Sequence, residues 1–565
     1  MNPTARYPRR FVPADLAPAD WDAVSRCFDA LERDLNAPGA DLEHWLASAS
    51  EFASVLAEEK ERRFVAMTCR TDDPETVRRF EEFVQGIEPK LKPRWHALHS
   101  GYLRHAKRSG LDPGRWRIHD RAVENEVSLF RPENVALEAE EEGLMQEYNK
   151  IAGAQTVRFR GEEQTLVRME SRLEEQDRAL RQEAWEAIWA RRLQDREALD
   201  ALYDKLIALR GRLAANAGQT DYRAYIFRKR ERFDYGPEHC FQFHQGVERA
   251  VMPRLRALDA ERKRRLGVDP LRPWDLGVDP RNAPPLRPFA TAEELYRGCR
   301  EMFRRVHPEF AELAEEIRLD LDNRKGKAPG GYQTSFEEER RPFIFMNATG
   351  TNRDVITMLH EGGHAFHYLL TREEPVLRYR YAPIEFCEVA SMGMELLALP
   401  HYEVFYGAEE ARRARVRQLE RTIRVLPMVA TIDAFQHWIY LNPGGGRDAR
   451  TAAWRGLSRR FAGGEDWSGY ETQFAAGWQR ILHLYTHPFY FIEYGIAQIG
   501  ALQIWSRARR DPAGAVAAYR RALALGGTRP LPELFRAADL VFDFSEATLA
   551  PLAEEIGGEL AKLDS

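Results

Sequence analysis

The chain has 565 residues, of which 44% are hydrophobic and 30% are charged, and its formal net charge is −5. This length predicts two or more domains or one large lobed body, and the small net charge excludes bulk electrostatic attraction to nucleic acid. No run approaches 18 consecutive apolar residues and the first residues contain no apolar signal region, so we expect no membrane association either.

The five cysteines lie far apart and include no C-x-x-C pair. This spacing excludes a zinc ribbon, a dithiol redox motif and a disulfide framework, and it favours a reducing, cytoplasmic location. The cysteines are Cys27, Cys69, Cys240, Cys299 and Cys387.

Helical periodicity dominates the first part of the chain. Between residues 16 and 150, apolar positions recur every three or four residues among dense charges, which predicts amphipathic helices. Alternating residues on both sides of Gly161 predict a small hairpin. A long amphipathic stretch over residues 171–216 then carries Trp185 and Trp189 on one stripe, which we interpret as core rather than as a ligand site.

The middle of the chain is less helical. The stretch 266–290 is rich in proline and glycine and is predicted to be a long connection. Two short strands, 331–336 and 342–347, follow with a charged turn between them. The whole is predicted to be mainly α with a minor β element. We expect an N-terminal helical lobe containing the hairpin over residues 1–195 and a catalytic domain over residues 196–565.

The string VITMLHEGGHAFHYLL sets three histidines and one glutamate into an apolar helix. His360 and His364 are four residues apart and therefore share one helix face, the spacing at which two imidazoles bind one metal ion. Glu361 is turned about 100° from His360, where it can act as a general base on water. Thr351 and Asp354 mark the start of this helix as a capping box.

A catalytic zinc needs a third protein ligand. The metzincin spacing requires glycine at position 367 and histidine at position 370, where this chain has His367 and Leu370, so that version is excluded. His367 is interpreted as part of the groove wall or as a group that supports the ligands, not as a third ligand. Pro375 and Pro383 allow the chain to reverse before a second apolar helix. Glu388 lies in the middle of that helix, where an unpaired carboxylate would be costly, and is the preferred ligand. The other candidates are Glu373, Glu374, Glu385 and Glu395, the last two as orienting groups or as structural ion pairs.

The string HEGGHAFH…FCEVASMGME resembles the oligoendopeptidase F and thimet oligopeptidase family of zinc metallopeptidases. RYPRRFVPADL, LRPWDL, RKGKAPGGYQTSF and PFIFMNATGT are also similar to that family, so the resemblance covers most of the chain and is closest to the oligoendopeptidase F branch. It implies a large bowl- or clam-like, two-lobed helical fold with a deep substrate groove. It also implies one Zn²⁺ per chain on the groove floor and a small β element beside the HExxH helix.

The resemblance further implies a late segment, rich in histidine and tyrosine, that faces the zinc. ILHLYTHPFYFIEYGIAQIG matches it. Tyr490 and Tyr494, four residues apart, are predicted to donate hydrogen bonds to the oxyanion of the attacked peptide. His483 is assigned beside them, with His487 as the alternative histidine. Simple packing of a helix core is the competing interpretation of the tyrosines.

The string APGGYQTSF predicts a place for the substrate backbone. Gly330 and Gly331 before Tyr332 would let a peptide approach a strand edge and pair with it as an added strand. Such binding depends on backbone more than on side chains and suits broad specificity. An ordinary glycine turn before a strand is the alternative.

Together these features predict a zinc-dependent endopeptidase that cuts internal bonds of short peptides. His360, His364 and Glu388 would hold the metal, and Glu361 would take a proton from water and deliver it to the leaving amine. The alternatives are a C-terminal-acting zinc carboxypeptidase or dipeptidyl carboxypeptidase, and a non-catalytic peptide-binding protein of the same fold. Short peptides are the expected partners, and the sequence is compatible with a monomer and with a homo-oligomer.

Overall fold

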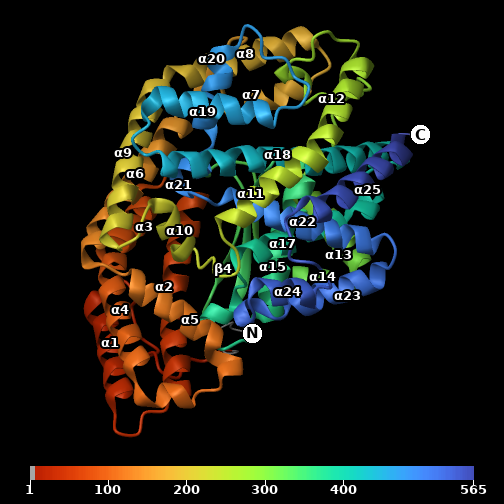
Figure 1. The fold of residues 1–565 in the computed structure, drawn as a ribbon. Helices are drawn as coiled ribbons and strands as arrows, with labels where there is room; N and C mark the ends of the chain where they lie inside the picture. Colours follow the sequence, from red (N-terminus) through yellow and green to blue (C-terminus); the bar gives the residue numbers. More distant parts are fainter. Residues whose placement is uncertain (1–6, 565) are drawn as a thin grey trace. The chain divides into compact units, whose positions relative to one another are not determined.

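The computed structural model describes residues 7–564, in which α-helices dominate and the strands form small sheets (Figure 1). The predicted mainly α class is therefore confirmed. Contacts divide the chain into two compact units, each assembled from three separate segments. Among the described residues, no helix is both long enough and apolar enough to cross a membrane. The bowl- or clam-like shape and the deep groove stay predictions.

The first unit comprises the residues up to Val135, Arg287–Ala411 and Gly500–Phe542. Its N-terminal helices share a core that includes Phe28, Phe52 and Tyr102. Its elements are α1 (Trp21–Asn36), α2 (Leu42–Cys69), α3 (Pro74–Gly86), α4 (Glu88–Arg104), α5 (Pro113–Leu129), α13 (Ala292–Val306), α14 (Pro308–Ala314), β3 (Arg318–Asp322), β4 (Tyr332–Phe336), β5 (Arg341–Ala348), α15 (Asn352–Thr371), α16 (Leu377–Arg380), α17 (Ile384–Leu397), α23 (Pro512–Leu523) and α24 (Leu531–Ala537).

The second unit comprises Ala136–Leu286, Arg412–Ile499 and the residues from Asp543 onward. Its elements, some of which begin or end in the first unit, are α6 (Pro132–Gly153), β1 (Thr156–Phe159), β2 (Glu162–Thr165), α7 (Leu166–Glu170), α8 (Arg178–Gln194), α9 (Arg196–Asn216), α10 (Tyr222–Lys229), α11 (Pro237–Gly246), α12 (Met252–Leu266), α18 (Ala408–Leu441), α19 (Gly446–Arg460), α20 (Glu471–Ala475), α21 (Leu482–Thr486), α22 (Phe491–Ala508) and α25 (Glu546–Asp564).

The sheet of the first unit has three strands in the order β3-β5-β4. β4 pairs with β5 in antiparallel fashion, with Tyr332 opposite Phe345 and Phe336 opposite Arg341, which confirms the two predicted strands. β3 was not predicted. It pairs parallel to β5, with Leu319 opposite Ile344, and it places β4 at an edge of the sheet.

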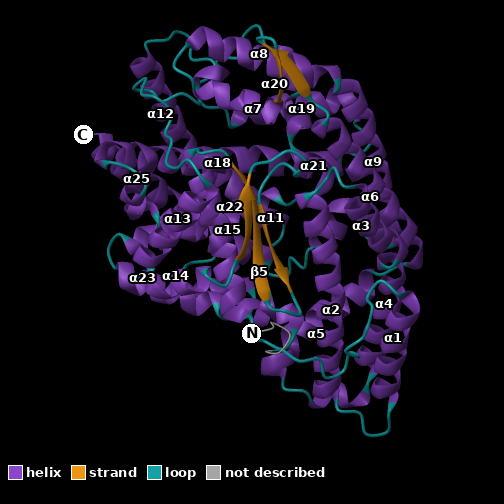
Figure 2. Cartoon of the chain, turned by 180° about the vertical axis from the view of Figure 1, so that it is seen from behind, coloured by secondary structure: helices purple, strands orange, loops and turns teal. Residues whose placement is uncertain are grey.

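This sheet lies between α2 and α15. Phe336, Phe343 and Phe345 are buried together and contact Val65 of α2, whereas β4 and β5 also contact α15. Figure 2 shows the strands beside α15. The small β element next to the HExxH helix is therefore confirmed.

The predicted features of the second unit are also present. β1 and β2 form the expected hairpin. The amphipathic stretch after it is two helices, α8 and α9, which meet at Asp195. Trp185 and Trp189 are buried in a cluster with Trp274, as predicted for core residues.

The motif LRPWDL has a structural role in this unit. Asp275 is fully buried, and its two carboxylate oxygens each accept a hydrogen bond at 2.8 Å, one from Arg178 and the other from Arg181. The backbone N–H of Arg272 donates a third hydrogen bond to the same carboxylate. The motif thus joins the connection after α12 to the start of α8.

The compact units are not consecutive along the chain. Residue 195, after which the predicted domain boundary falls, lies inside the second unit between α8 and α9. The division into residues 1–195 and 196–565 stays a prediction.

Candidate metal centre

Helix α15 positions the two histidines and the glutamate of the HExxH motif. Its start is stabilised by the predicted capping box, in which Asp354 accepts hydrogen bonds from the backbone N–H and the hydroxyl of Thr351, both at 2.9 Å. One helical turn separates His360 from His364, and their ring centroids lie 5.0 Å apart. Both rings therefore face the same side of the helix.

Helix α17 brings Glu388 to this face. The Oε2 atom of Glu388 lies 3.5 Å from Nε2 of His360 and 3.8 Å from Nε2 of His364. One donor atom from each of the three residues lies within 4.8 Å of the others. The structure therefore brings together the three residues that the sequence predicted as ligands, and their nitrogen and oxygen donors suit a zinc ion.

A glycine makes this approach of α17 to α15 sterically feasible. A Cβ atom at Gly363 would lie 2.6 Å from the carbonyl oxygen of Ala390 and 2.6 Å from the Cα of Ser391. Both atoms belong to the α17 backbone, which cannot yield as a flexible side chain would. The second glycine of HEGGH therefore allows close contact of the two helices.

The polar groups behind the candidate ligands orient them. Nδ1 of His360 lies 2.7 Å from Oε1 of Glu395, which leaves Nε2 to face Glu388. The hydroxyl of Ser391 donates to Oε2 of Glu388 at 3.1 Å, and the backbone at Cys387 hydrogen bonds to His364. The sequence left Glu395 open between an orienting group and a structural ion pair, and the Ser391 and Cys387 contacts were not predicted.

The two histidines differ in basicity when no metal is bound. Burial lowers the pKa of His360, but the hydrogen bond and charge of Glu395 outweigh burial and raise it to about 9. Burial, together with the charge of His360, lowers the pKa of His364 to about 3. Metal binding to His360 must therefore release a proton at neutral pH, whereas His364 already offers a neutral nitrogen.

Glu361 lies beside the ligands and is buried, with 7% of the residue exposed. Burial raises the pKa of Glu361 to about 7, which the charge of His360 opposes and that of Glu388 reinforces. A hydrogen bond from the backbone of Gln333 in β4 favours the ionised carboxylate. This link between the candidate base and the edge strand was not predicted.

His367 lies one turn further along α15 and is not in the ligand cluster. It is 3% exposed, its ring faces Phe386 edge-on, and its Nε2 atom has no hydrogen-bond partner. Burial lowers its pKa to about 3. His367 is therefore a buried packing residue, and its exclusion as a ligand stays a prediction.

The predicted oxyanion donors lie in the second unit and are close to one another. The ring centroids of Tyr490 and Tyr494 are 5.0 Å apart, and that of His483 lies 5.5 and 6.0 Å from them. The ring of His487 lies 6.1 Å from that of Tyr490. The four residues form one aromatic cluster, and their predicted roles in catalysis and substrate binding stay predictions.

The two glycines at positions 330 and 331 directly precede β4, as expected from the sequence. Gly330 has a φ of +101°, which favours glycine, and a Cβ at Gly331 would lie 3.3 Å from the side chain of Thr357 in α15. The Tyr332 ring stacks on Phe345, and its hydroxyl lies 2.6 Å from that of Thr68 in α2. The side chain of Tyr332 is thus engaged in packing, and its role toward a peptide stays a prediction.

Two histidines and a glutamate converge on one point, with a buried glutamate beside them, and form a candidate metal-binding site on a mainly helical fold. Comparison with protein families shows that the chain belongs to peptidase family M3, whose model matches residues 171–554. This is a family of metallopeptidases. The resemblance noted in the sequence is thereby confirmed.

Individual relatives agree with this assignment. The chain is similar to PZ peptidase A, solved with an inhibitor, at 28% identity and a TM-score of 0.91 over 98% of this chain and 99% of that one. It is 25% identical to oligopeptidase PepF of Bacillus subtilis over 292 residues, which are 49% of this chain and 42% of that protein. It is 33% identical to the chromosomal oligoendopeptidase F of Lactococcus lactis subsp. cremoris over 81 residues, 14% of this chain and 13% of that protein. The matched segments thus span less than half the length of these two curated relatives.

Proposed function

We propose that the protein is a zinc-dependent endopeptidase that hydrolyses internal bonds of short peptides. The observation that carries this proposal is the convergence of His360, His364 and Glu388 beside the buried carboxylate of Glu361. Two imidazoles and one carboxylate are a common protein donor set of catalytic zinc, which keeps a further position open. Membership of family M3 and the oligopeptidase names of the relatives support short peptides as substrates.

The residues have distinct tasks in this proposal. When held by the three ligands, Zn²⁺ supplies Lewis acidity and makes water more acidic. Glu361 takes a proton from the attacking water and later delivers it to the leaving amine. Glu395 keeps the His360 ring oriented through Nδ1, and the burial of Glu361 limits competing water around the base.

The free edge of β4 supplies a binding mode for the substrate. Among the strands that the structure describes, β4 pairs with β5 alone, and the glycines at 330 and 331 precede it without side chains. We infer that a peptide adds to this edge as a further strand, so that recognition relies on backbone hydrogen bonds. Gln333 belongs to the same strand and hydrogen bonds to Glu361, which would bring the bound backbone near the candidate base.

We also place this activity in the cytoplasm. The cysteines of the described chain form no disulfide, which agrees with a reducing compartment. Secretion tests with a tagged full-length chain would check this assignment.

The decisive variant is Glu361→Gln. It keeps the size of the side chain and all three ligands, so we expect it to retain zinc but to lose nearly all peptidase activity. Zinc content by mass spectrometry and turnover of an internally quenched fluorogenic peptide measure the two effects separately. Near-normal turnover by a zinc-loaded variant would contradict the role of Glu361.

The position of the cut separates the alternatives. A peptide blocked at both ends should be cleaved internally, and mass spectrometry of the products shows where. If only peptides with a free C-terminus were cleaved, the protein would be a carboxypeptidase or dipeptidyl carboxypeptidase. Peptide binding without any cleavage by the zinc-loaded wild type would identify a non-catalytic binding protein.

A further inference from the structure

A second group of metal-binding side chains lies in the second unit, on α11 and α18. Each helix contributes two residues spaced four apart: Cys240 and His244 from α11, and Asp433 and His437 from α18. At this spacing both residues of a pair lie on one helix face. Two facing pairs therefore offer four donors, in the way that HExxH offers two from one helix.

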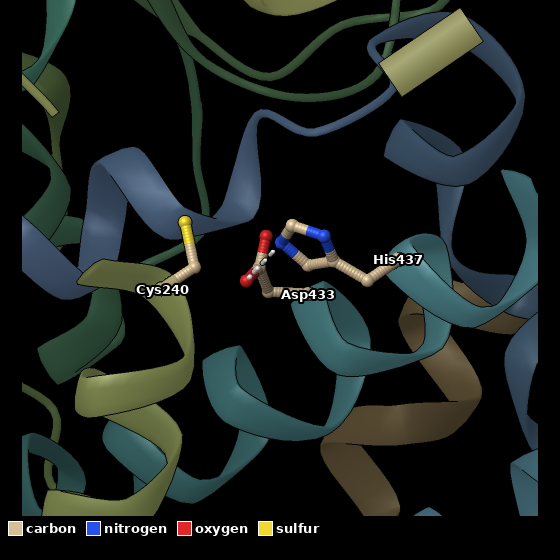
Figure 3. A group of neighbouring side chains, drawn as sticks. All are labelled: Cys240, Asp433 and His437. Carbon is tan, nitrogen blue, oxygen red and sulfur yellow. Dashed lines mark ion pairs between the residues drawn. The ribbon is translucent and has the colours of Figure 1, made fainter. Parts of the chain in front are cut away.

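The four side chains are close together. Donor atoms of Cys240, Asp433 and His437 lie within 4.8 Å of one another, and Figure 3 shows the three side chains converging from the two helices. The fourth residue, His244, has its Nε2 atom 2.8 Å from Oδ2 of Asp433. A tetrahedral zinc ion with bonds of about 2.0–2.3 Å holds its ligand atoms roughly 3.3–3.8 Å apart. His244 is not part of the group within 4.8 Å, so its ring must move away from Asp433 and toward the other two donors to become the fourth ligand.

The group is buried, and hydrogen bonds satisfy only part of it. Cys240 and Asp433 are 0% exposed, and His437 is 2% exposed. The Oδ1 atom of Asp433 and the Nε2 atom of His437 have no hydrogen-bond partner. Nε2 of His437 lies 3.4 Å from Oδ2 of Asp433, which is too long for a good hydrogen bond. Buried polar atoms without partners are costly, and a cation between them would remove this cost.

The neighbouring contacts define a metal-free competitor. The Cys240 thiol lies 3.7 Å from the carbonyl oxygen of Gly236, and Nη1 of Arg223 lies 3.5 Å from Nδ1 of His437. Without a metal, Asp433 would be an ionised carboxylate between two imidazoles. In this arrangement Oδ2 accepts a hydrogen bond from His244, whereas the buried Oδ1 has no hydrogen-bond partner, and the burial of that second oxygen is left unexplained.

We propose that Cys240, His244, Asp433 and His437 hold a second, structural Zn²⁺ ion. One thiolate, two imidazoles and one carboxylate form a donor set that suits zinc, and four protein ligands leave no open position for water. The site therefore differs in chemistry from the His360–His364–Glu388 centre and is independent of the proposed peptidase activity. Its task is to join α11 to α18, which are far apart in the sequence.

Loading of this site follows a simple proton balance. The Cys240 thiol loses its proton to solvent when Sγ binds the ion. His244 and His437 bind through Nε2 and then carry their hydrogens on Nδ1. The hydrogen of a neutral His244 that is now shared with Asp433 therefore moves from Nε2 to Nδ1, and the thiol proton is the one that is released. No oxidant or reductant takes part.

Cobalt substitution tests the proposal on the full-length protein. A cysteine thiolate bound to Co²⁺ gives an intense charge-transfer absorption in the near ultraviolet, which the sulfur-free centre on α15 and α17 cannot give. We expect two equivalents of metal per chain and this absorption in the wild type. A His360→Ala, His364→Ala double variant should lose one equivalent of metal and keep the absorption. The experiment therefore tests the site on α11 and α18 separately from the site on α15 and α17.

Two serine variants form a matched pair. Cys240→Ser should lose the thiolate absorption and one equivalent of metal. Cys299→Ser, which changes another fully buried cysteine of the chain, should keep both. The proposal is overturned if the folded wild type binds one equivalent without the absorption, or if the absorption persists in Cys240→Ser. The wild-type spectrum decides the matter even if the Cys240 variant does not fold.

Discussion

Glu395 determines which nitrogen of His360 is available to a metal. Its Oε1 atom lies 2.7 Å from Nδ1 of the ring, so the hydrogen is held on Nδ1 and the lone pair of Nε2 faces Glu388. Carboxylates in this position fix the orientation of metal-bound histidines and increase their basicity. Glu395 itself is 7% exposed, so the hydrogen bond to His360 offsets part of the cost of burying a charge there.

The variant Glu395→Gln should weaken metal binding by about 10- to 100-fold, the usual effect of losing such a partner. The amide keeps the shape of the side chain but not its charge. Titration of the apo-protein with a competing zinc chelator measures the affinity. Glu373→Gln, an exposed change in the same unit, is the control and should leave the affinity unchanged. An unaltered affinity in Glu395→Gln would show that the contact serves packing alone.

Single residues of this centre were predictable to different degrees. The HExxH motif could be identified from the sequence because the spacing of its histidines matches the helical repeat. Glu388 was preferred as the third ligand because its neighbours are apolar. Gln333 was not predictable, because its contribution is a backbone hydrogen bond across 28 residues of chain. The cluster around Asp433 was missed for a related reason: neither i, i+4 pair is informative until folding brings α11 and α18 together.

At the scale of elements, the crossing of α15 and α17 depends on the size of one residue. Gly363 contacts the α17 backbone where even a methyl group would clash. The candidate ligand Glu388 lies on α17 just before this contact, so any displacement of the helix also displaces its carboxylate. Strand β4 also contacts α15. The positions of Glu388 on α17 and of the β4 edge relative to the HExxH residues therefore both depend on their packing against α15.

We expect Gly363→Ala to lower both stability and metal affinity. The added Cβ must push α17 away, which separates Glu388 from the histidines. Thermal unfolding and zinc titration measure the two effects. Gly211→Ala is the matched control, because a Cβ there has nothing within 4 Å and alanine favours the helix by up to about 1 kcal/mol. Normal zinc affinity in Gly363→Ala would show that Glu388 does not depend on this contact.

The Asp275 motif makes a second prediction at this scale. Asp275→Asn removes the charge that Arg178 and Arg181 compensate and should destabilise the protein by about 3–5 kcal/mol. These contacts lower the folded-state pKa of Asp275 although burial alone would raise it. The wild type should therefore keep this stabilisation above the unfolded-state pKa of about 3.9 and lose it as the pH falls through the lower folded value.

Urea unfolding between neutral and acidic pH measures this effect. The Asp275→Asn variant should lack the corresponding part of the acid dependence. Asp466→Asn, which affects a partly exposed pair with Arg272, is the control and should change stability by no more than about 1 kcal/mol. Equal acid dependence in the wild type and Asp275→Asn would refute the assignment.

Elements were predicted well where local periodicity determines them. The HExxH helix, the β1–β2 hairpin and the β4–β5 pair appear where the sequence indicated. β3 was missed although Leu319 and Leu321 alternate with acids, because a short strand that pairs in parallel has no adjacent turn to mark it. The break between α8 and α9 at Asp195 was missed because apolar periodicity continues through it.

At the scale of the whole molecule, the compact units are interleaved along the chain. Each unit uses three segments, and α18 and α22 contain residues of both. A linear division into domains was the natural reading of the sequence, since nothing in composition marks a return of the chain. Long-range contacts decide which segments belong together, and these are not visible in local patterns.

We expect the fragment 196–565 not to fold by itself. It lacks α8, whose Trp185 and Trp189 complete the cluster with Trp274, and it lacks α1–α5 of the first unit. Near-ultraviolet circular dichroism and limited proteolysis should show a loosely packed, easily digested chain beside an intact full-length control. A cooperative thermal transition of the fragment would instead support a domain boundary after residue 195.

The separation along the chain of the residues that meet at the two candidate metal sites has a consequence for biosynthesis. His360 and Glu395 are 35 residues apart, whereas His244 and Asp433 are 189 residues apart. Closing the longer loop costs about 1.5 kcal/mol more in chain entropy. It also requires that α18 has left the ribosome, whereas the α15–α17 pair is complete before α18 has been synthesised. A nascent chain would therefore acquire the metal on α15 and α17 first, and any ion between α11 and α18 only later.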